Sequence, residues 1–215
     1  MTSEAVVREE RLARVALSVS WEPGDARLAA QIEEVGAEAT VEALIGKPVA
    51  GARRTASQAR LRAADPVSVL DRAEATGVRF VVPGDEEWPE SLDVLAHVER
   101  DGFGGRPFGL WARGPLRLNE VLARSVSVVG SRAASAYGEF VATELGAALA
   151  ERGACVVSGA AYGIDAAAHR GALAVGGRTV AVLACGVDVP YPRGNTQLLS
   201  LIAAEGLIVS EVPLG

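Results

Sequence analysis

Hydrophobic positions follow a helical period through the first part of the chain. Apolar residues recur three or four positions apart over residues 8–20, and the same spacing continues in short segments up to Gly77. Helix-start signals separate these segments, namely Asp25 as an N-cap and Asp65-Pro66 before an apolar run. The pattern predicts a small all-helical domain over residues 1–76, of the kind that often carries helix-hairpin-helix modules.

From residue 77 onward the pattern changes to short apolar runs, several of them rich in Val, separated by helical segments. Such runs, bounded by small residues, indicate strands buried on both faces. Their alternation with helices predicts right-handed crossovers, and therefore an α/β fold: a Rossmann-like open parallel sheet with helices on both faces. This second domain spans residues 77–215. Its strands are expected at 78–82, 108–111, 126–129, 155–158, 179–184 and 207–212.

Small and polar residues follow the predicted strands. Gly130-Ser131-Arg132 comes after one strand, and Ser158-Gly159 with Gly163 comes after the next. In a parallel sheet these turns meet at the carboxyl edge, where backbone N–H groups and helix N-termini favour an anion. Gly186 and Glu211 follow or end the next two strands and mark the rim of the same pocket.

Arg132 suits bidentate contact with a phosphate, and the hydroxyls of Ser131 and Ser158 can donate to the same oxygens. We therefore expect an anion pocket at this edge. The alternative is that the glycines only form turns and that Arg132 pairs with a nearby carboxylate.

Two tyrosines belong to the same predicted edge. Tyr162 lies in the turn after the second of these strands, and Tyr191 precedes Pro192 in a later loop. A tyrosine ring beside an anion groove can stack on a nucleobase. The alternative is that each ring pins its own loop to the sheet.

The composition of the chain restricts the classes of protein to which it can belong. Hydrophobic residues make up 49% of the 215 residues, which indicates a globular chain. The formal net charge of −6 means that any nucleic-acid contact is confined to a local basic site. The basic segment 53–64 is interpreted as a solvated surface, with phosphate contact as the alternative.

Membrane, metal and disulfide sites are not indicated. No apolar run approaches the roughly 20 residues of a membrane span, and no Cys/His cluster has metal-ligand spacing. Cys155 and Cys185 are expected to be small core residues, which agrees with a reducing cytoplasmic location.

Cofactor and catalytic motifs are also missing. The turn at residue 130 is not Gly-x-Gly-x-x-Gly, and the chain has no P-loop, so no cofactor is expected. Ser158, Asp165 and His169 supply the residue types of a hydrolase. However, Asp165 and His169 are one helical turn apart and can pair with each other, and Ser158 lacks a nucleophile-elbow motif. We therefore predict a protein that is not an enzyme, with no catalytic residue.

A series of motifs resembles the bacterial DNA-processing protein A (DprA/Smf) family, in order and spacing, over residues 126–213. The helical part resembles the sterile-alpha-motif-like or helix-hairpin-helix domain of that family only loosely. The matching segments are Val-Val-Gly-Ser-Arg at 128–132 with Tyr137-Gly138, the run 158–165 with Ala168-His169, the run 176–183, Tyr191-Pro192, the run 210–213 and, upstream, Trp88-Pro89.

The resemblance implies a single-stranded DNA-binding protein of natural transformation. Such a protein protects incoming DNA, loads RecA for recombination and acts as a homodimer. Carried over, Gly130, Ser131 and Arg132 form the phosphate pocket, and Ser158, Gly159 and Gly163 line it.

The family's Phe-x-x-Arg-Asn segment does not follow before Gly215. The sequence is therefore interpreted as a truncated member or a fragment, and the homodimer is expected of the family rather than of this chain. The alternative class is a lysine-decarboxylase-like phosphoribohydrolase. The Pro-Gly-Gly-x-Gly-Thr motif of that class is missing, and Glu211 is the only carboxylate at the predicted pocket edge.

Overall fold

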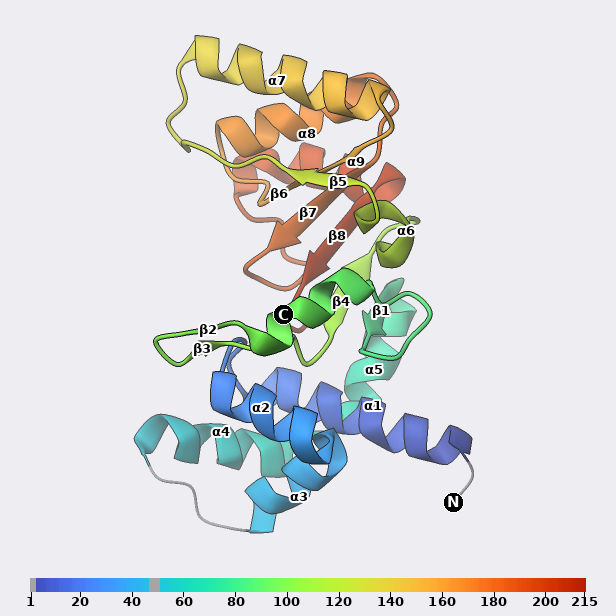
Figure 1. Cartoon of the computed structure of the whole chain (residues 1–215), viewed down its shortest axis with the longest axis vertical. Coiled ribbons are helices and arrows are strands. Elements are labelled where there is room, and N and C mark those ends of the chain that lie inside the picture. Colours follow the sequence, from blue (N-terminus) through green and yellow to red (C-terminus); the bar gives the residue numbers. More distant parts are fainter. Residues whose placement is uncertain (1–2, 47–50) are drawn as a thin grey trace.

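The computed structural model describes residues 3–46 and 51–215 (Figure 1). Its first part is helical, as predicted. Asp25 caps the second helix by accepting a hydrogen bond from the Leu28 N–H, and Asp65 caps the fifth by accepting from the Ser68 N–H. The helices are α1 (Ser3–Ser20), α2 (Ala26–Val35), α3 (Ala37–Gly46), α4 (Ala52–Ala63) and α5 (Pro66–Ala75).

The basic helix α4 uses its arginines within the helical part of the protein. Arg53 pairs with Glu22, and the Arg54 guanidinium lies 5.6 Å from the centroid of the Trp21 ring. Arg60 donates to the Ser20 carbonyl at 2.8 Å. The interpretation of α4 as a solvated surface, with phosphate contact as the alternative, stays a prediction.

The second part contains a six-stranded sheet with the order β1-β4-β8-β7-β6-β5. The neighbouring pairs among β5 to β8 are parallel, as predicted, whereas β4 lies antiparallel between β8 and β1. Helices α7 (Ala136–Glu151), α8 (Ile164–Ala174) and α9 (Thr196–Glu205) connect the parallel strands. The strands are β1 (Val78–Val81), β4 (Leu110–Arg113), β5 (Ser125–Ser127), β6 (Cys155–Ser158), β7 (Thr179–Leu183) and β8 (Leu207–Ser210).

Both faces of the sheet carry helices, which confirms the predicted architecture. On one face Trp111 and Ile208 pack with Leu199 and Ile202 of α9. The opposite face packs against Trp88 and against a short helix, α6 (Leu118–Leu122). Val15 of α1 and Ala73 of α5 belong to the same cluster as Trp111, so the helical part packs directly on the sheet. The proposed boundary near residue 76 falls between α5 and β1, and the division into two domains there stays a prediction.

Two details of the strand prediction were wrong. β5 was expected to be buried on both faces, but it is the edge strand and all its residues are exposed. Residues 101–107, predicted to be a surface loop, include one strand of a small hairpin, β2 (Glu99–Arg100) with β3 (Phe103–Gly104). An apolar run does not reveal whether a strand lies at the centre or the edge of its sheet. The described residues also include two 3₁₀ helices, η1 (Glu90–His97) and η2 (Arg193–Asn195).

Over residues 3–46 and 51–215, no helix combines the length and the apolar character needed to cross a membrane.

Candidate anion site at the carboxyl edge of the sheet

The turn after β5 rests directly on the turn after β6. A Cβ atom on Gly130 would lie 2.7 Å from Ile164 Cγ1, so only glycine allows this approach. The Ile164 N–H donates to the Ser131 carbonyl at 3.2 Å. Gly163 has a φ of +74°, and a Cβ atom there would lie 2.3 Å from the Ser131 oxygen. The glycines therefore bring two turns that are distant in sequence into contact.

A cavity of about 360 Å³ opens at this edge. It brings together five of the predicted site residues, which come from the ends of β5 and β6 and from the loop after β7. The lining residues are Val129, Gly130, Arg132, Gly159, Ala161, Tyr162, Asp165, Val182, Leu183, Ala184, Cys185, Tyr191 and Pro192.

Arg132 is the cation of this cavity. Its side chain is exposed, and in the described part of the chain no carboxylate lies within ion-pair distance of it. The neighbouring Ser131 hydroxyl accepts a hydrogen bond from the Ala133 N–H at 3.1 Å, which leaves its own proton available. The geometry therefore favours an anion-binding arginine over one committed to an internal ion pair.

Five of the predicted residues lie outside the cavity lining, and one of them is Ser131, which immediately precedes Arg132. The Ser158 hydroxyl donates to the Val128 carbonyl at 2.6 Å and is buried, so it does not donate to a ligand in this conformation. Gly163 packs against the turn that carries Arg132, where an added Cβ atom would lie 2.3 Å from the Ser131 oxygen. Gly186 packs against the chain at Pro213, whose oxygen would lie 2.6 Å from an added Cβ atom. Glu211 is partly buried, and its burial raises the pKa of that carboxyl group.

The tyrosines present their rings at the cavity. Tyr162 accepts a hydrogen bond from the Gly194 N–H at 3.3 Å through its hydroxyl, so it does hold the neighbouring loop. Its side chain is nevertheless 49% exposed, and that of Tyr191 is 64% exposed. Both rings therefore remain accessible for stacking on a ligand.

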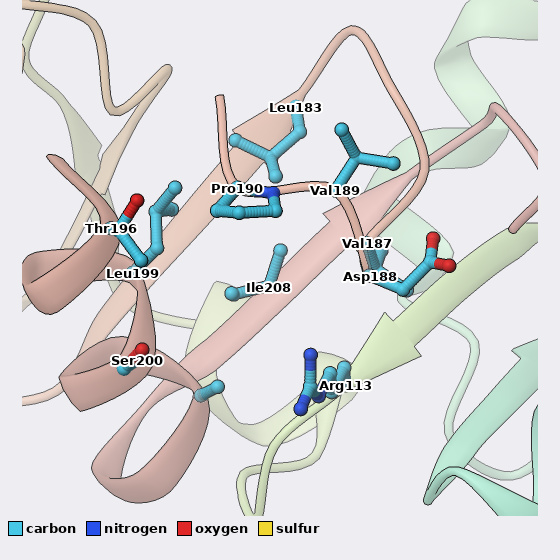
Figure 2. Close-up of a pocket in the computed structure, with 11 residues that line it drawn as sticks. Arg113, Leu183, Val187, Asp188, Val189, Pro190, Thr196, Leu199, Ser200 and Ile208 are labelled. Carbon is cyan, nitrogen blue, oxygen red and sulfur yellow. The ribbon is translucent and has the colours of Figure 1, made fainter. Parts of the chain in front are cut away.

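A second cavity, of about 190 Å³, lies between α9 and the loop that follows β7 (Figure 2). Its cation is Arg113, at the end of β4, and its other walls include Leu199, Val187 and Ile208. None of the predicted site residues lines it.

The hydrolase-like trio is not assembled. His169 Nδ1 lies 2.7 Å from the Thr179 hydroxyl, which itself donates to the Val156 carbonyl at 2.8 Å. This arrangement fits the ring tautomer that carries its proton on Nδ1. Ser158 donates to the backbone and not to His169. Within the described residues, no group of three or more His, Cys, Asp or Glu side chains is placed to hold a metal ion.

Burial keeps His169 neutral and makes stability depend on pH. Desolvation lowers the pKa of His169 from 6.5 to about 4, although the nearby Asp165 carboxylate and the Ser158 backbone act in the opposite direction. The unfolded chain therefore binds a proton more readily than the native state. The resulting stability is present above pH 6.5 and is lost as the pH falls toward 4.

We expect the free energy of unfolding to fall by about 2 kcal/mol between pH 7 and pH 5 because of this one residue. Urea unfolding at a series of pH values measures it. His169→Asn should flatten the profile in this window, whereas substitution of the exposed His97 by Asn should leave it unchanged. An unaltered profile in His169→Asn would contradict the assignment.

The fold and the cavity define a Rossmann-like α/β protein with an open, arginine-bearing pocket at the carboxyl ends of its parallel strands. The profile of the family described as "DNA recombination-mediator protein A" matches residues 79–215. The chain belongs to this family, which confirms the resemblance inferred from its motifs.

Curated relatives with the names DprA and Smf support the same family assignment. The chain is 47% identical over 213 residues to the "Putative DNA processing protein DprA" of Mycobacterium tuberculosis, covering 93% of this chain and 52% of the relative. It is 37% identical over 153 residues to "Protein Smf" of Synechocystis, covering 70% of this chain and 36% of the relative. In the first of these comparisons the chain spans about half the length of its relative.

Two solved structures are similar. The DNA processing protein A (DprA) of Streptococcus pneumoniae matches with a TM-score of 0.67 and 26% identity, over 96% of this chain and 68% of that chain. The DNA processing protein A of Helicobacter pylori, whose structure is described as giving insights into a single-stranded DNA binding mode, matches with a TM-score of 0.51. That match has 27% identity over 63% of this chain and 56% of the other.

Of the charged residues that line the cavity, Asp165 was not predicted as part of the binding site. Asp165 was considered only as a partner of His169, yet its side chain lines the cavity. The signal was its position in the first turn of the helix that follows the second glycine turn.

Proposed function

We propose that this chain binds single-stranded DNA at the cavity formed by the turns after β5, β6 and β7. One observation carries the proposal: Arg132, free of internal ion pairs among the described residues, faces a cavity that also holds two accessible tyrosine rings. A sugar–phosphate chain with unstacked bases needs such a combination of cation and aromatic surface. The described binding mode of the H. pylori relative supports this choice of ligand.

We propose that the protein acts by binding and not by catalysis. Glu211, the only carboxylate expected at the pocket edge for a phosphoribohydrolase, does not line the cavity. The buried Ser158 and His169 are committed to other partners.

The wider role we propose follows the family. It comprises protection of single strands taken up in natural transformation, loading of RecA for recombination, action as a homodimer and location in the cytoplasm. The family description, with its reference to a recombination mediator, supports the link to recombination. We also propose that residues 1–76 form a separate helical domain that supports the DNA-binding domain at 77–215.

Replacing Arg132 by Ala should weaken binding of single strands of every sequence. It should also flatten the slope of log K against log salt by about 0.7, the value for one lost phosphate contact on a single strand. Fluorescence anisotropy with a labelled dT12 strand at several salt concentrations measures both. Arg152→Ala is the matched control, because Arg152 follows the far end of α7 and its side chain donates to the Ala148 carbonyl.

Equal affinities for Arg132→Ala and the parent would remove Arg132 from the site. A parent chain that binds no single strand at low salt would contradict the proposed function itself.

A further inference from the structure

The smaller cavity, between α9 and the loop that follows β7, contains a cation without a partner inside the described chain (Figure 2). This cation is Arg113, the last residue of β4. Among the arginines of residues 3–46 and 51–215, Arg113 alone is partly buried and has no side-chain hydrogen bond or ion pair. A guanidinium group carries five donors, and removing it from water without an acceptor is costly. An anion beside Arg113 would supply the missing acceptor.

The walls around this arginine are aliphatic. Leu183, Val187, Leu199 and Ile208 line the cavity, and all four are buried. None of the lining residues is aromatic. In Figure 2, Leu183 lies at one end of the cavity and Arg113 at the other, with Ile208 between them. A ligand that fills this space therefore combines an apolar part with one anionic end.

The size of the cavity and its single arginine restrict the ligand further. The volume of about 190 Å³ lies below the roughly 300 Å³ at which pockets for drug-sized ligands begin, so a nucleotide is too large. Free phosphate is small enough, but it has no apolar part, and its second negative charge meets no second cation in the lining. A carboxylate carries one negative charge and accepts two parallel hydrogen bonds from a guanidinium group. A carboxylate on a short, branched aliphatic chain therefore matches both the walls and the charge.

The same cavity has a carboxylate of the protein in its lining. Asp188 belongs to the loop after β7 and is exposed. One of its oxygens accepts a hydrogen bond from the Gly215 N–H at 3.2 Å. In the described part of the chain Asp188 forms no ion pair with Arg113, and Figure 2 shows the two side chains on different walls. Two opposite charges that stay apart in one small cavity suit the two charged groups of a zwitterion.

We propose that this cavity binds a small aliphatic α-amino acid of about the size of leucine. The carboxylate of the ligand accepts from Arg113, its ammonium group faces Asp188, and its branched side chain packs against Leu199 and Ile208. The site is separate from the proposed DNA-binding cavity, because Leu183 is the one lining residue that the two cavities share. The C-terminal residue of another protein has the same carboxylate and side chain but no ammonium group, so the test separates these two sources.

Isothermal titration calorimetry with four compounds tests the ligand chemistry on the unmodified chain. L-Leucine should bind with a dissociation constant on the order of 1 mM or lower. Glycine should bind at least about tenfold more weakly, because it lacks the side chain that the aliphatic walls remove from water. N-acetyl-L-leucine, which imitates the C-terminus of a protein, should bind about fivefold more weakly, the scale of one exposed ion pair. Inorganic phosphate should give no heat of binding.

Two variants test the assigned residues. Arg113→Met keeps an aliphatic stem but removes the cation, and it should weaken leucine binding by about tenfold or more. Arg124→Met is the matched control, because the exposed Arg124 precedes β5 at the far edge of the sheet and does not line the cavity. Asp188→Asn should make the affinities for leucine and N-acetyl-L-leucine equal.

The proposal is overturned if leucine gives no heat of binding at concentrations on the order of 10 mM. Tighter binding of phosphate or N-acetyl-L-leucine than of leucine would overturn it as well, and so would an unchanged leucine affinity in Arg113→Met. The ligand series needs no substitution and Asp188 is exposed, so these two arms decide the question even where Arg113→Met does not fold. None of these outcomes bears on single-strand binding.

Discussion

Replacing Gly163 by alanine is expected to lower the free energy of unfolding by at least about 3 kcal/mol. The backbone at Gly163 has φ +74° and ψ −125°, a combination that residues with a Cβ atom rarely adopt. The new Cβ atom would also lie 2.3 Å from the Ser131 oxygen and 3.0 Å from the Arg132 oxygen. The substitution therefore pushes directly on the turn that carries Arg132, and single-strand binding should weaken with it.

Gly176→Ala is the matched control for this effect. Gly176 has a φ of +69°, but an added Cβ atom meets nothing within 4 Å. Its replacement should cost only the backbone strain, about 1–2 kcal/mol, and should leave DNA affinity unchanged. Urea unfolding followed by circular dichroism gives both values, and equal losses in the two variants would show that contact with the Arg132 turn is not important.

Trp111→Ala should destabilise the protein by about 3–5 kcal/mol. The side chain is fully buried in β4, where that strand joins the parallel part of the sheet to β1. Its ring centroid lies 4.4 Å from that of Phe80, and it belongs to the cluster that also includes Val15 of the helical part. Its removal leaves a large cavity at the point where the helices and the sheet meet.

Replacing Trp111 by Phe separates the contribution of ring packing from the cost of burying the indole N–H group. Among the described residues, the Trp111 Nε1–H is buried without a hydrogen-bond partner. Phenylalanine therefore removes an unfavourable group while it keeps an aromatic ring against Phe80. We expect it to cost less than half as much as alanine, by urea unfolding followed by far-ultraviolet circular dichroism. Equal costs would mean that the ring contact contributes little.

Local signals predicted much of the fold. The Asp25 and Asp65 caps mark the starts of their helices because a cap acts through backbone groups only a few residues away. The alternation of strands and helices predicted the parallel arrangement of β5 to β8 for a similar reason, since each crossover is short. The exposure of β5 could not be predicted in this way, because it depends on which strand lies beyond it in the sheet.

The residues of the binding cavity were likewise predicted only in part from the sequence. The sequence alone determined that small, basic and aromatic residues follow the strands, since turn chemistry and the family motifs are local in the chain. The folded protein decided that Gly130, Arg132 and Tyr191 share a cavity and that Ser158 faces the Val128 carbonyl instead. It also decided that Asp165 faces the ligand space. These outcomes depend on strand order and on contacts between residues tens of positions apart, which no local pattern encodes.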